Sequence, residues 1–274
     1  MTLRLLSYNI RYGGAGREEK IAAVIGACAP DVVVLQEATK PLVVERVAAA
    51  TGMAQWGSRK GESLGFMSRE PVEHVAWHRP RVSRHAFIEI VPRGVRWRVF
   101  GLHLSAVHAA WTERRRWYEL RALLVAIQQH QRGPHVLIGD FNTLAPGELL
   151  DIRELPARLR ALVWLSGGKI RWRTIQQVLD AGYRDAFRHL QPDLVGLTFP
   201  TWRPHVRLDY LFVPEPFLSR VTACRVVTDG AVRDASDHFP LLAELSDASA
   251  SVAAHQIEPR EQARAQHDVR STAR

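Results

Sequence analysis

At 274 residues the chain is long enough for one large domain or two small ones, and its content of 46% hydrophobic and 24% charged residues is that of an ordinary folded protein. No apolar run reaches the length of a membrane span, which excludes stable membrane insertion from our expectations. The formal net charge of +9 comes mostly from arginine; it favours polyanionic partners such as nucleic acid or anionic lipid, although arginine-rich composition is also a genomic bias.

The chain begins with a strand, a helix and a second strand. LRLLSYNI, 3–10, is strand-like almost from the first residue and lacks the layout of a signal peptide, so we expect a cytoplasmic protein. In REEKIAAVIGACAPD, 17–31, Ile21, Val24, Ile25 and Cys28 have helical spacing, and acidic residues lie in the first turn. DVVVLQE, 31–37, is a β-branched run typical of a strand that is buried on both faces.

The middle and the end of the chain continue this alternation. RHAFIEIV, 84–91, and VRWRVFGLHLS, 95–105, are joined by PRG and predict a hairpin. A helix is expected from about Trp111 to His130, with Trp117, Leu120 and Ile127 on one face. Further strands are expected at 136–140, 207–213 and 239–246.

Two segments fall outside this pattern. Residues 144 to about 180 form a longer, basic insertion with helical character, either an ordinary helical crossover or a lid over a strand end. From residue 247 the chain is poor in apolar residues. We therefore expect a single folded domain at 1–246 and a disordered tail at 247–274.

Polar residues gather where the predicted strands end. They are Asn9, Glu37, His103, Asp140, Asn142, Asp209, Asp237 and His238. Each one alone is most simply a turn or cap residue, but strands of a packed sheet end along common rims, so the whole set can converge on one cleft.

These residue types suit the hydrolysis of a phosphate ester. Glu37, with Asn9 as a neutral oxygen ligand, suits a hard cation such as Mg²⁺ or Mn²⁺. Asp140 can orient or deprotonate a water molecule, and Asn142 can hold the water or the phosphate by hydrogen bonds. His238, with a carboxylate partner, can contact a phosphoryl oxygen.

Six segments carry a resemblance to a known family. SYNI at 7–10, LQE at 35–37, the histidine of GLHLS, GDFN at 139–142, RLDYLF at 207–212 and SDHFP at 236–240 resemble, in this order, the signature segments of the endonuclease/exonuclease/phosphatase superfamily. The resemblance spans residues 1 to about 245. It implies an α/β fold, a four-layer α/β/β/α sandwich of two mixed sheets with helices on the outer faces and the active site at one rim.

The resemblance also implies roles for individual residues. Asn9 and Glu37 would bind the metal, and Asp237 would lie near it. His103 would contact the scissile phosphate or assist the leaving group. The remaining roles are water activation by Asp140, water orientation by Asn142, and stabilisation of the phosphorus centre by His238 in a pair with Asp209.

The sequence departs from some branches of the superfamily. Arg11 stands where abasic-site endonucleases usually have an acidic residue, and Phe141 stands where tyrosyl-DNA phosphodiesterases tend to have threonine. In TFPTWRPHVRLDY, 198–210, Trp202 and Arg203 are candidates for substrate binding, with core packing as the alternative for Trp202.

The sequence thus predicts a metal-dependent phosphoric ester hydrolase, most simply a phosphodiesterase or nuclease that attacks nucleic acid in line with an activated water. Two alternatives stay open: a phosphatase or phosphodiesterase for a lipid head group or small phosphate ester, and a non-catalytic binding protein that retains the fold.

Overall fold

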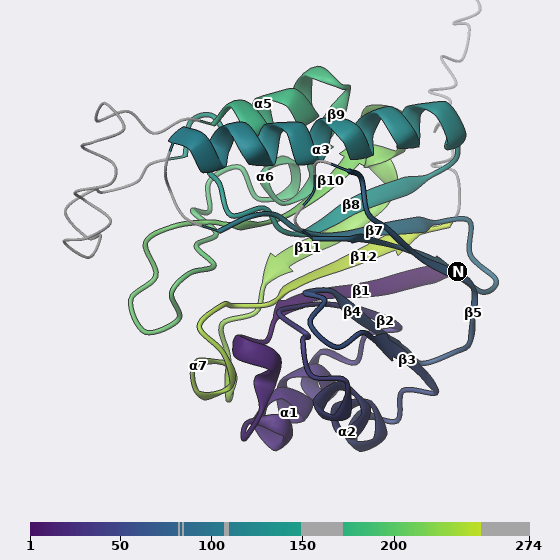
Figure 1. Cartoon of the computed structure of the whole chain (residues 1–274), viewed down its shortest axis with the longest axis vertical. Coiled ribbons are helices and arrows are strands. Elements are labelled where there is room, and N and C mark those ends of the chain that lie inside the picture. The colour runs from purple at the N-terminus through teal and green to yellow at the C-terminus, as the bar shows by residue number, and fades with distance from the viewer. Residues whose placement is uncertain (82, 84, 107–109, 149–171, 248–274) are drawn as a thin grey trace, which may run out of the picture.

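The computed structural model describes residues 1–81, 83, 85–106, 110–148 and 172–247 (Figure 1). Its strands are β1 Thr2–Asn9, β2 Val32–Gln36, β3 Gln55–Ser58, β4 Gly65–Ser68, β5 Val72–His78, β6 Phe87–Pro92, β7 Arg98–His103, β8 His135–Asp140, β9 Tyr183–Asp185, β10 Asp209–Pro214, β11 Val221–Val226 and β12 Leu241–Ser246. Its helices are η1 Tyr12–Gly14, α1 Glu18–Cys28, α2 Pro41–Thr51, α3 Ala110–His130, α5 Arg173–Asp180, α6 Ala186–Leu190, η3 Glu215–Arg220 and α7 Val232–Ala235.

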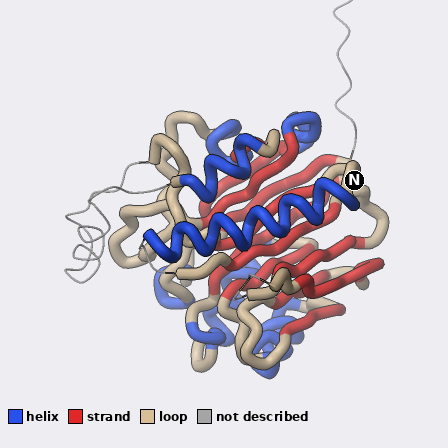
Figure 2. The backbone as a smooth tube through the Cα atoms, turned by 45° about the horizontal axis from the view of Figure 1, so that its top comes forward, coloured by secondary structure: helices blue, strands red, loops and turns tan. Residues whose placement is uncertain are grey.

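The strands form two six-stranded sheets, in the orders β11-β12-β1-β2-β4-β3 and β5-β6-β7-β8-β10-β9. Helices α1 and α2 cover the outer face of the first sheet, and α3 and α5 cover the outer face of the second (Figures 1 and 2). Parallel and antiparallel pairs occur in both sheets. The predicted four-layer α/β/β/α sandwich is therefore confirmed.

Three apolar clusters separate the four layers. The first lies between the sheets and includes Leu5 and Val34 from one sheet with Ile90 and Ile138 from the other. The second packs α1 and α2 on the first sheet, and the third packs α3 and α5 on the second. Burial of each cluster removes apolar surface from water and fixes the two sheets face to face.

The register of the first sheet brings the ends of two strands to one rim. β1 runs parallel to β2, with Asn9 opposite Gln36, so that Asn9 and the next residue of the second strand, Glu37, end side by side. β1 also pairs antiparallel with β12, and this pairing joins the first strand of the chain to the last described one.

The register of the second sheet places three polar residues in one row. β7 is parallel to β8 with His103 opposite Asp140, and β10 is antiparallel to β8 with Asp209 opposite Asp140. Parallel strands end at the same edge, and the antiparallel β10 begins there. The row His103, Asp140, Asp209 therefore lies at the end of this sheet.

Most of the expected helices and strands are present, and parts of the expected insertion and tail lie outside the described residues. The hairpin is formed by β6 and β7, and the expected helix is α3. Of the insertion at 144–180, residues 149–171 lie outside the described residues, and 173–180 form α5. Of the expected tail, 248–274 lies outside as well. Among the described residues, no helix combines the length and apolar character needed to cross a membrane.

Candidate active site

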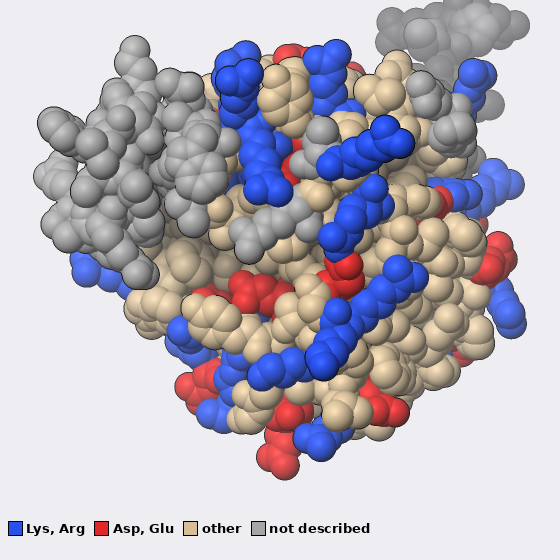
Figure 3. Space-filling view, in the orientation of Figure 1, with Lys and Arg blue, Asp and Glu red and all other residues tan. Residues whose placement is uncertain are grey.

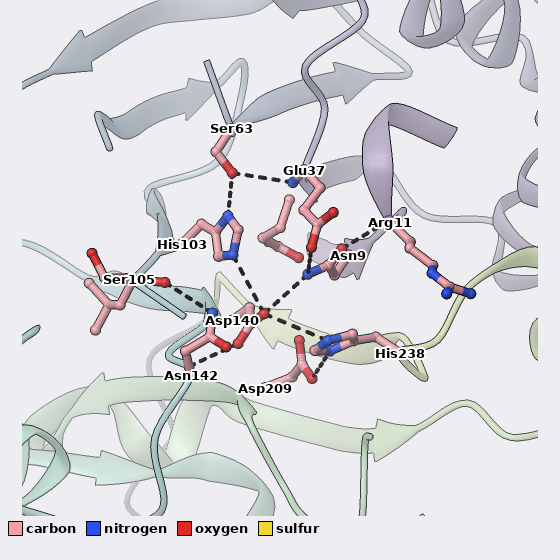
Figure 4. A network of polar contacts seen from close by, with 12 residues as sticks. Asn9, Arg11, Glu37, Ser63, His103, Ser105, Asp140, Asn142, Asp209 and His238 are labelled. Atoms are coloured by element: carbon pink, nitrogen blue, oxygen red, sulfur yellow. Dashed lines mark hydrogen bonds and ion pairs between the residues drawn. The ribbon is translucent and has the colours of Figure 1, made fainter. Parts of the chain in front are cut away.

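The first sheet contributes Asn9 and Glu37, which are held together at the rim. The Asn9 amide donates to Glu37 Oε1 at 3.3 Å (Figure 4). The backbone N–H of Tyr12 donates to Glu37 Oε2 at 2.6 Å. Glu37 has a φ of 56°, a left-handed conformation that is uncommon outside glycine and asparagine. The end of β2 thus turns sharply, and both carboxylate oxygens of Glu37 are oriented by hydrogen bonds.

The second sheet contributes Asp140, which lies at the centre of the site. Its Oδ2 accepts a hydrogen bond from the Asn9 amide at 3.1 Å, and its Oδ1 accepts one from the backbone N–H of Asn142 at 2.9 Å. The preceding residue, Gly139, has a φ of 149°, and a Cβ there would lie 2.0 Å from the carbonyl oxygen of Leu102. Only glycine allows β7 and β8 to approach closely enough to present Asp140 in this way.

Two histidines face the same carboxylate oxygen. Asp140 Oδ2 lies 3.7 Å from His103 Nε2 and 3.8 Å from His238 Nε2 (Figure 4). Burial raises the pKa of Asp140, the nearby His238 opposes this shift and the Asp209 carboxylate adds to it, so that together they bring the pKa to about 7. Asp140 is therefore poised to hold or release a proton near neutral pH.

His238 is paired with Asp209. His238 Nδ1 donates to Asp209 Oδ2 at 2.9 Å, and both side chains are buried. Burial by itself would lower the pKa of His238, but the carboxylates of Asp209 and Asp140 outweigh it and raise the pKa to about 10. His238 is thus a cation that presents its Nε2–H toward Asp140, with its orientation set by Asp209.

His103 and Asn142 are oriented from their other sides. The ring nitrogen Nδ1 of His103 is hydrogen bonded to the hydroxyl of Ser63, which lies in the loop before β4 and also accepts from the backbone N–H of Glu37 at 3.4 Å. Asn142, with a φ of 51°, donates its side-chain amide to the carbonyl of Leu104 at 3.0 Å. Asparagine tolerates this left-handed conformation better than most residues.

Asp237 lies beside the site and contacts Arg11. Arg11 Nε is 3.3 Å from Asp237 Oδ2, and the Arg11 backbone N–H donates to Asn9 Oδ1 at 3.0 Å. Arg11, which stands where abasic-site endonucleases usually have an acidic residue, thus forms an ion pair with Asp237 at the rim. Trp202 is 62% exposed and is not part of the core, and the neighbouring Arg203 is also exposed.

Two loops of the candidate site are supported from behind by a buried ionic network on α3. Glu113 accepts hydrogen bonds from Arg116 Nη2 at 3.0 Å, from the Thr143 hydroxyl at 3.0 Å and from the Thr174 backbone N–H at 2.9 Å. Arg116 Nη1 also donates to the carbonyl of Ser105 at 2.7 Å. Thr143 follows the Asp140 loop and Ser105 follows His103, so this network fixes the two loops relative to each other.

Two groups of side chains offer ligands for a cation. One is the set of oxygen donors Asn9, Glu37 and Asp237 at the rim. The other is Asp140, Asp209 and His238, whose ligand atoms all lie within 4.8 Å of one another. In the second group a buried hydrogen bond already joins His238 Nδ1 to Asp209 Oδ2.

The site thus contains residues that the sequence did not single out. Ser63, Tyr12 and the α3 network were missed, and Arg11 was noted only as a departure. The sequence signal for them is weak, because each acts through a contact between segments that are far apart in the chain.

On one face of the molecule, acidic atoms lie in a recess near the middle, with arginine and lysine side chains on the surrounding surface (Figure 3).

A family model described as the Endonuclease/Exonuclease/phosphatase family matches residues 6–238. The chain belongs to this family. Its members are phosphoric ester hydrolases, and this assignment agrees with the convergence of six sequence segments at one rim. No curated protein sequence matches the chain significantly.

Solved structures share the fold at low sequence identity. The 3′ phosphatase NExo from Neisseria, bound to a product DNA hairpin, aligns with a TM-score of 0.67 at 21% identity, covering 89% of this chain and 99% of that one. An AP endonuclease from Archaeoglobus fulgidus aligns with a TM-score of 0.67 at 18% identity, covering 88% and 98%. An endonuclease/exonuclease/phosphatase from Beutenbergia cavernae gives 0.64 at 23%, covering 92% and 73%.

Proposed function

We propose that the protein is a divalent-metal-dependent phosphodiesterase that hydrolyses nucleic acid by in-line attack of an activated water. The observation that carries this proposal is the position of Asp140, whose Oδ2 is shared by the Asn9 amide at 3.1 Å and faced by two histidines within 3.8 Å. This arrangement supports a general base, a cationic proton donor and oxygen ligands for a cation around a single point.

Glu37 fits a divalent cation, because its carboxylate is partly exposed at the rim, and Asn9 Oδ1, which accepts from the Arg11 backbone N–H, is a second oxygen donor. Mg²⁺ and Mn²⁺ are the ions that such ligands favour, and a bound cation would neutralise the negative charge that develops on the phosphate. Asp237 is the third candidate ligand; its contact with Arg11 supports a place at the edge of this set.

The chain's own residues supply the remaining chemistry. Asp140 would accept a proton from the attacking water, and Asn142 would orient that water. The protonated His238, held by Asp209, would donate a hydrogen bond to a phosphoryl oxygen, and His103 would lie beside the phosphate or the leaving group. Removal of a positioned acid or base of this kind costs about 10²- to 10⁴-fold in rate.

Nucleic acid is the favoured substrate for two reasons. The net charge of +9 favours a polyanion. Structural relatives include a 3′ phosphatase bound to a DNA hairpin and an AP endonuclease, which supports this substrate class for the present chain.

The test uses bis-p-nitrophenyl phosphate and a labelled oligonucleotide with the purified protein. We expect chelation to abolish hydrolysis of both and Mg²⁺ or Mn²⁺ to restore it, because the oxygen ligands need a cation to bind phosphate. Asp140→Asn and His238→Ala should each lower kcat by at least about a hundredfold.

The matched controls are Asp193→Asn and His189→Ala, which change the same residue types at exposed positions and should leave kcat near the wild-type value. Activity that survives complete chelation would exclude the metal. A protein that hydrolyses neither substrate under any metal condition would instead be a binding protein that has kept the fold.

A further inference from the structure

Two exposed aromatic side chains flank an arginine at the rim of the site. Tyr12 is 74% exposed and Trp202 is 62% exposed. The guanidinium carbon of Arg11 lies 5.3 Å from the centre of the Tyr12 ring and 5.8 Å from that of Trp202, within the range of cation–π contact. We call Arg11, Tyr12 and Trp202 the aromatic lip.

The aromatic lip is attached directly to the residues of the site. Arg11 Nε lies 3.3 Å from Asp237 Oδ2, the residue before His238, and the backbone N–H of Tyr12 donates to Glu37. The exposed rings therefore stand next to the place where the phosphate would bind.

The backbone behind Trp202 is also fixed. The Thr201 N–H donates to the carbonyl of Asp237 at 2.9 Å, and the Thr201 hydroxyl donates to the carbonyl of Ser236 at 2.8 Å. The ring of Phe199, in the same loop, lies 4.8 Å from that of His238. Trp202 is thus presented to solvent by a loop that is bonded to the catalytic segment 236–238.

Large aromatic side chains that are exposed on a fixed backbone suit a ligand with a flat face. A nucleobase has such a face, and stacking of one base on an aromatic side chain contributes about 1–3 kcal/mol without regard to sequence. The base must be unpaired, because a paired base stacks within its own duplex. The guanidinium of Arg11 adds a positive charge for a neighbouring phosphate.

We propose that the aromatic lip stacks an unpaired nucleobase next to the scissile phosphate, so that the enzyme prefers single strands or frayed ends to paired duplex. This inference rests on the proposed function and narrows its substrate class. Trp202 is the main stacking surface, Tyr12 is the second, and Arg11 contacts the adjoining phosphate.

The first test measures stacking without turnover. A short single strand that carries 2-aminopurine is mixed with the Asp140→Asn variant, and the fluorescence of the base is followed. We expect quenching with Asp140→Asn and its loss when Trp202→Ala is added, whereas Trp202→Phe in the same background should restore it, since a phenyl ring also stacks.

The second test compares substrates by steady-state kinetics. We expect the wild type to have a lower KM for a single strand than for a blunt duplex of the same sequence. Trp202→Ala should raise the single-strand KM by about tenfold or more, a change that matches the loss of one stacked base. The effect of Trp202→Ala on kcat should be small. The fold decrease in kcat/KM that it causes should be at least about tenfold smaller for bis-p-nitrophenyl phosphate than for the single strand. Tyr12→Ala should act in the same direction, and the exposed Tyr118→Ala serves as the matched control.

Four results would overturn the proposal: no quenching, equal KM for single strand and duplex, equal losses for Trp202→Ala and Trp202→Phe, or a Trp202→Ala variant that loses binding to anionic phospholipid vesicles but not to the single strand. Failure of the proposed function is distinct, because it would appear as absence of hydrolysis of bis-p-nitrophenyl phosphate by the wild type.

Discussion

His135, at the start of β8, has a charge state that burial decides. Burial lowers the pKa of His135, and the nearby Arg98 lowers it further, while the hydrogen bond to Gly133 opposes the shift. Both ring nitrogens have partners, with Nδ1 at 2.8 Å from the carbonyl of Gly133 and Nε2 at 2.7 Å from the hydroxyl of Tyr183. A neutral ring that donates from Nδ1 and accepts at Nε2 satisfies both contacts.

The lowered pKa of His135 predicts a loss of stability in mild acid. Its pKa is lower in the folded protein than the ordinary 6.5, so the unfolded chain binds the proton more readily. The contribution of His135 to the free energy of unfolding is therefore fully present above about pH 6.5 and is lost as the pH falls toward the lowered pKa of His135. Urea unfolding at about pH 7.5 and 5.5 should show a smaller decline for His135→Gln than for the wild type.

The exposed His189 provides the control for this experiment, because His189→Gln should keep the wild-type pH dependence. An equal decline in wild type and His135→Gln would show that other groups account for the acid sensitivity.

The residues that the sequence could predict are those with local signals. Asp140 follows a buried strand and is preceded by glycine, and Glu37 ends a β-branched run, so each is visible from its own segment. Ser63 is not visible in this way. A serine in a loop is an ordinary turn residue, and its contact with His103 exists only because the two sheets pack against each other.

At the scale of elements, α3 both covers the second sheet and supports the active site. Its apolar face, with Leu120, Leu124 and Ile127, lies in the third cluster, while Glu113 and Arg116 are buried in its first turns. Buried charges are stable only when they are paired and hydrogen bonded, and these two satisfy each other and the loops around them.

Loss of one member of this buried pair should be costly. Arg116→Met removes the cation and leaves the carboxylate of Glu113 buried, so we expect the free energy of unfolding to fall by about 3 kcal/mol or more in urea titrations. We also expect kcat to fall, since the carbonyl of Ser105 loses its donor. Arg114→Met, at an exposed position two residues earlier, should change stability by about 0.5 kcal/mol or less. Similar stabilities for the two variants would contradict the supporting role of Arg116.

Several elements were not expected from the sequence, for recognisable reasons. β4 spans four fully buried residues and has no alternation to reveal it. α2 contains three valines, which favour strands, yet Pro41 at its first turn and Gly52 in the left-handed conformation at its end are ordinary helix boundaries. The framework of the first sheet could therefore be predicted only in part, whereas the strands that carry the active site were recognisable.

At the scale of the whole molecule, the net charge of +9 gives a prediction about salt. Binding of a polyanion releases counterions, so kcat/KM for a single strand should fall by about tenfold or more between roughly 50 and 200 mM salt. Hydrolysis of bis-p-nitrophenyl phosphate should change much less, because that ester carries a single charge. Equal salt dependence for both substrates would favour a small ester as the natural substrate.

The neighbouring positions of β1 and β12 have a practical consequence. The hydroxyl of Ser236 donates to the carbonyl of Asn9 at 2.6 Å, which joins the two extremes of the site across 227 positions of the chain. No proteolytic fragment that lacks either extreme can assemble the complete constellation, and neither can an intermediate in which the first and last strands have not yet met. Turnover therefore serves as a count of fully native molecules in a refolding or storage experiment.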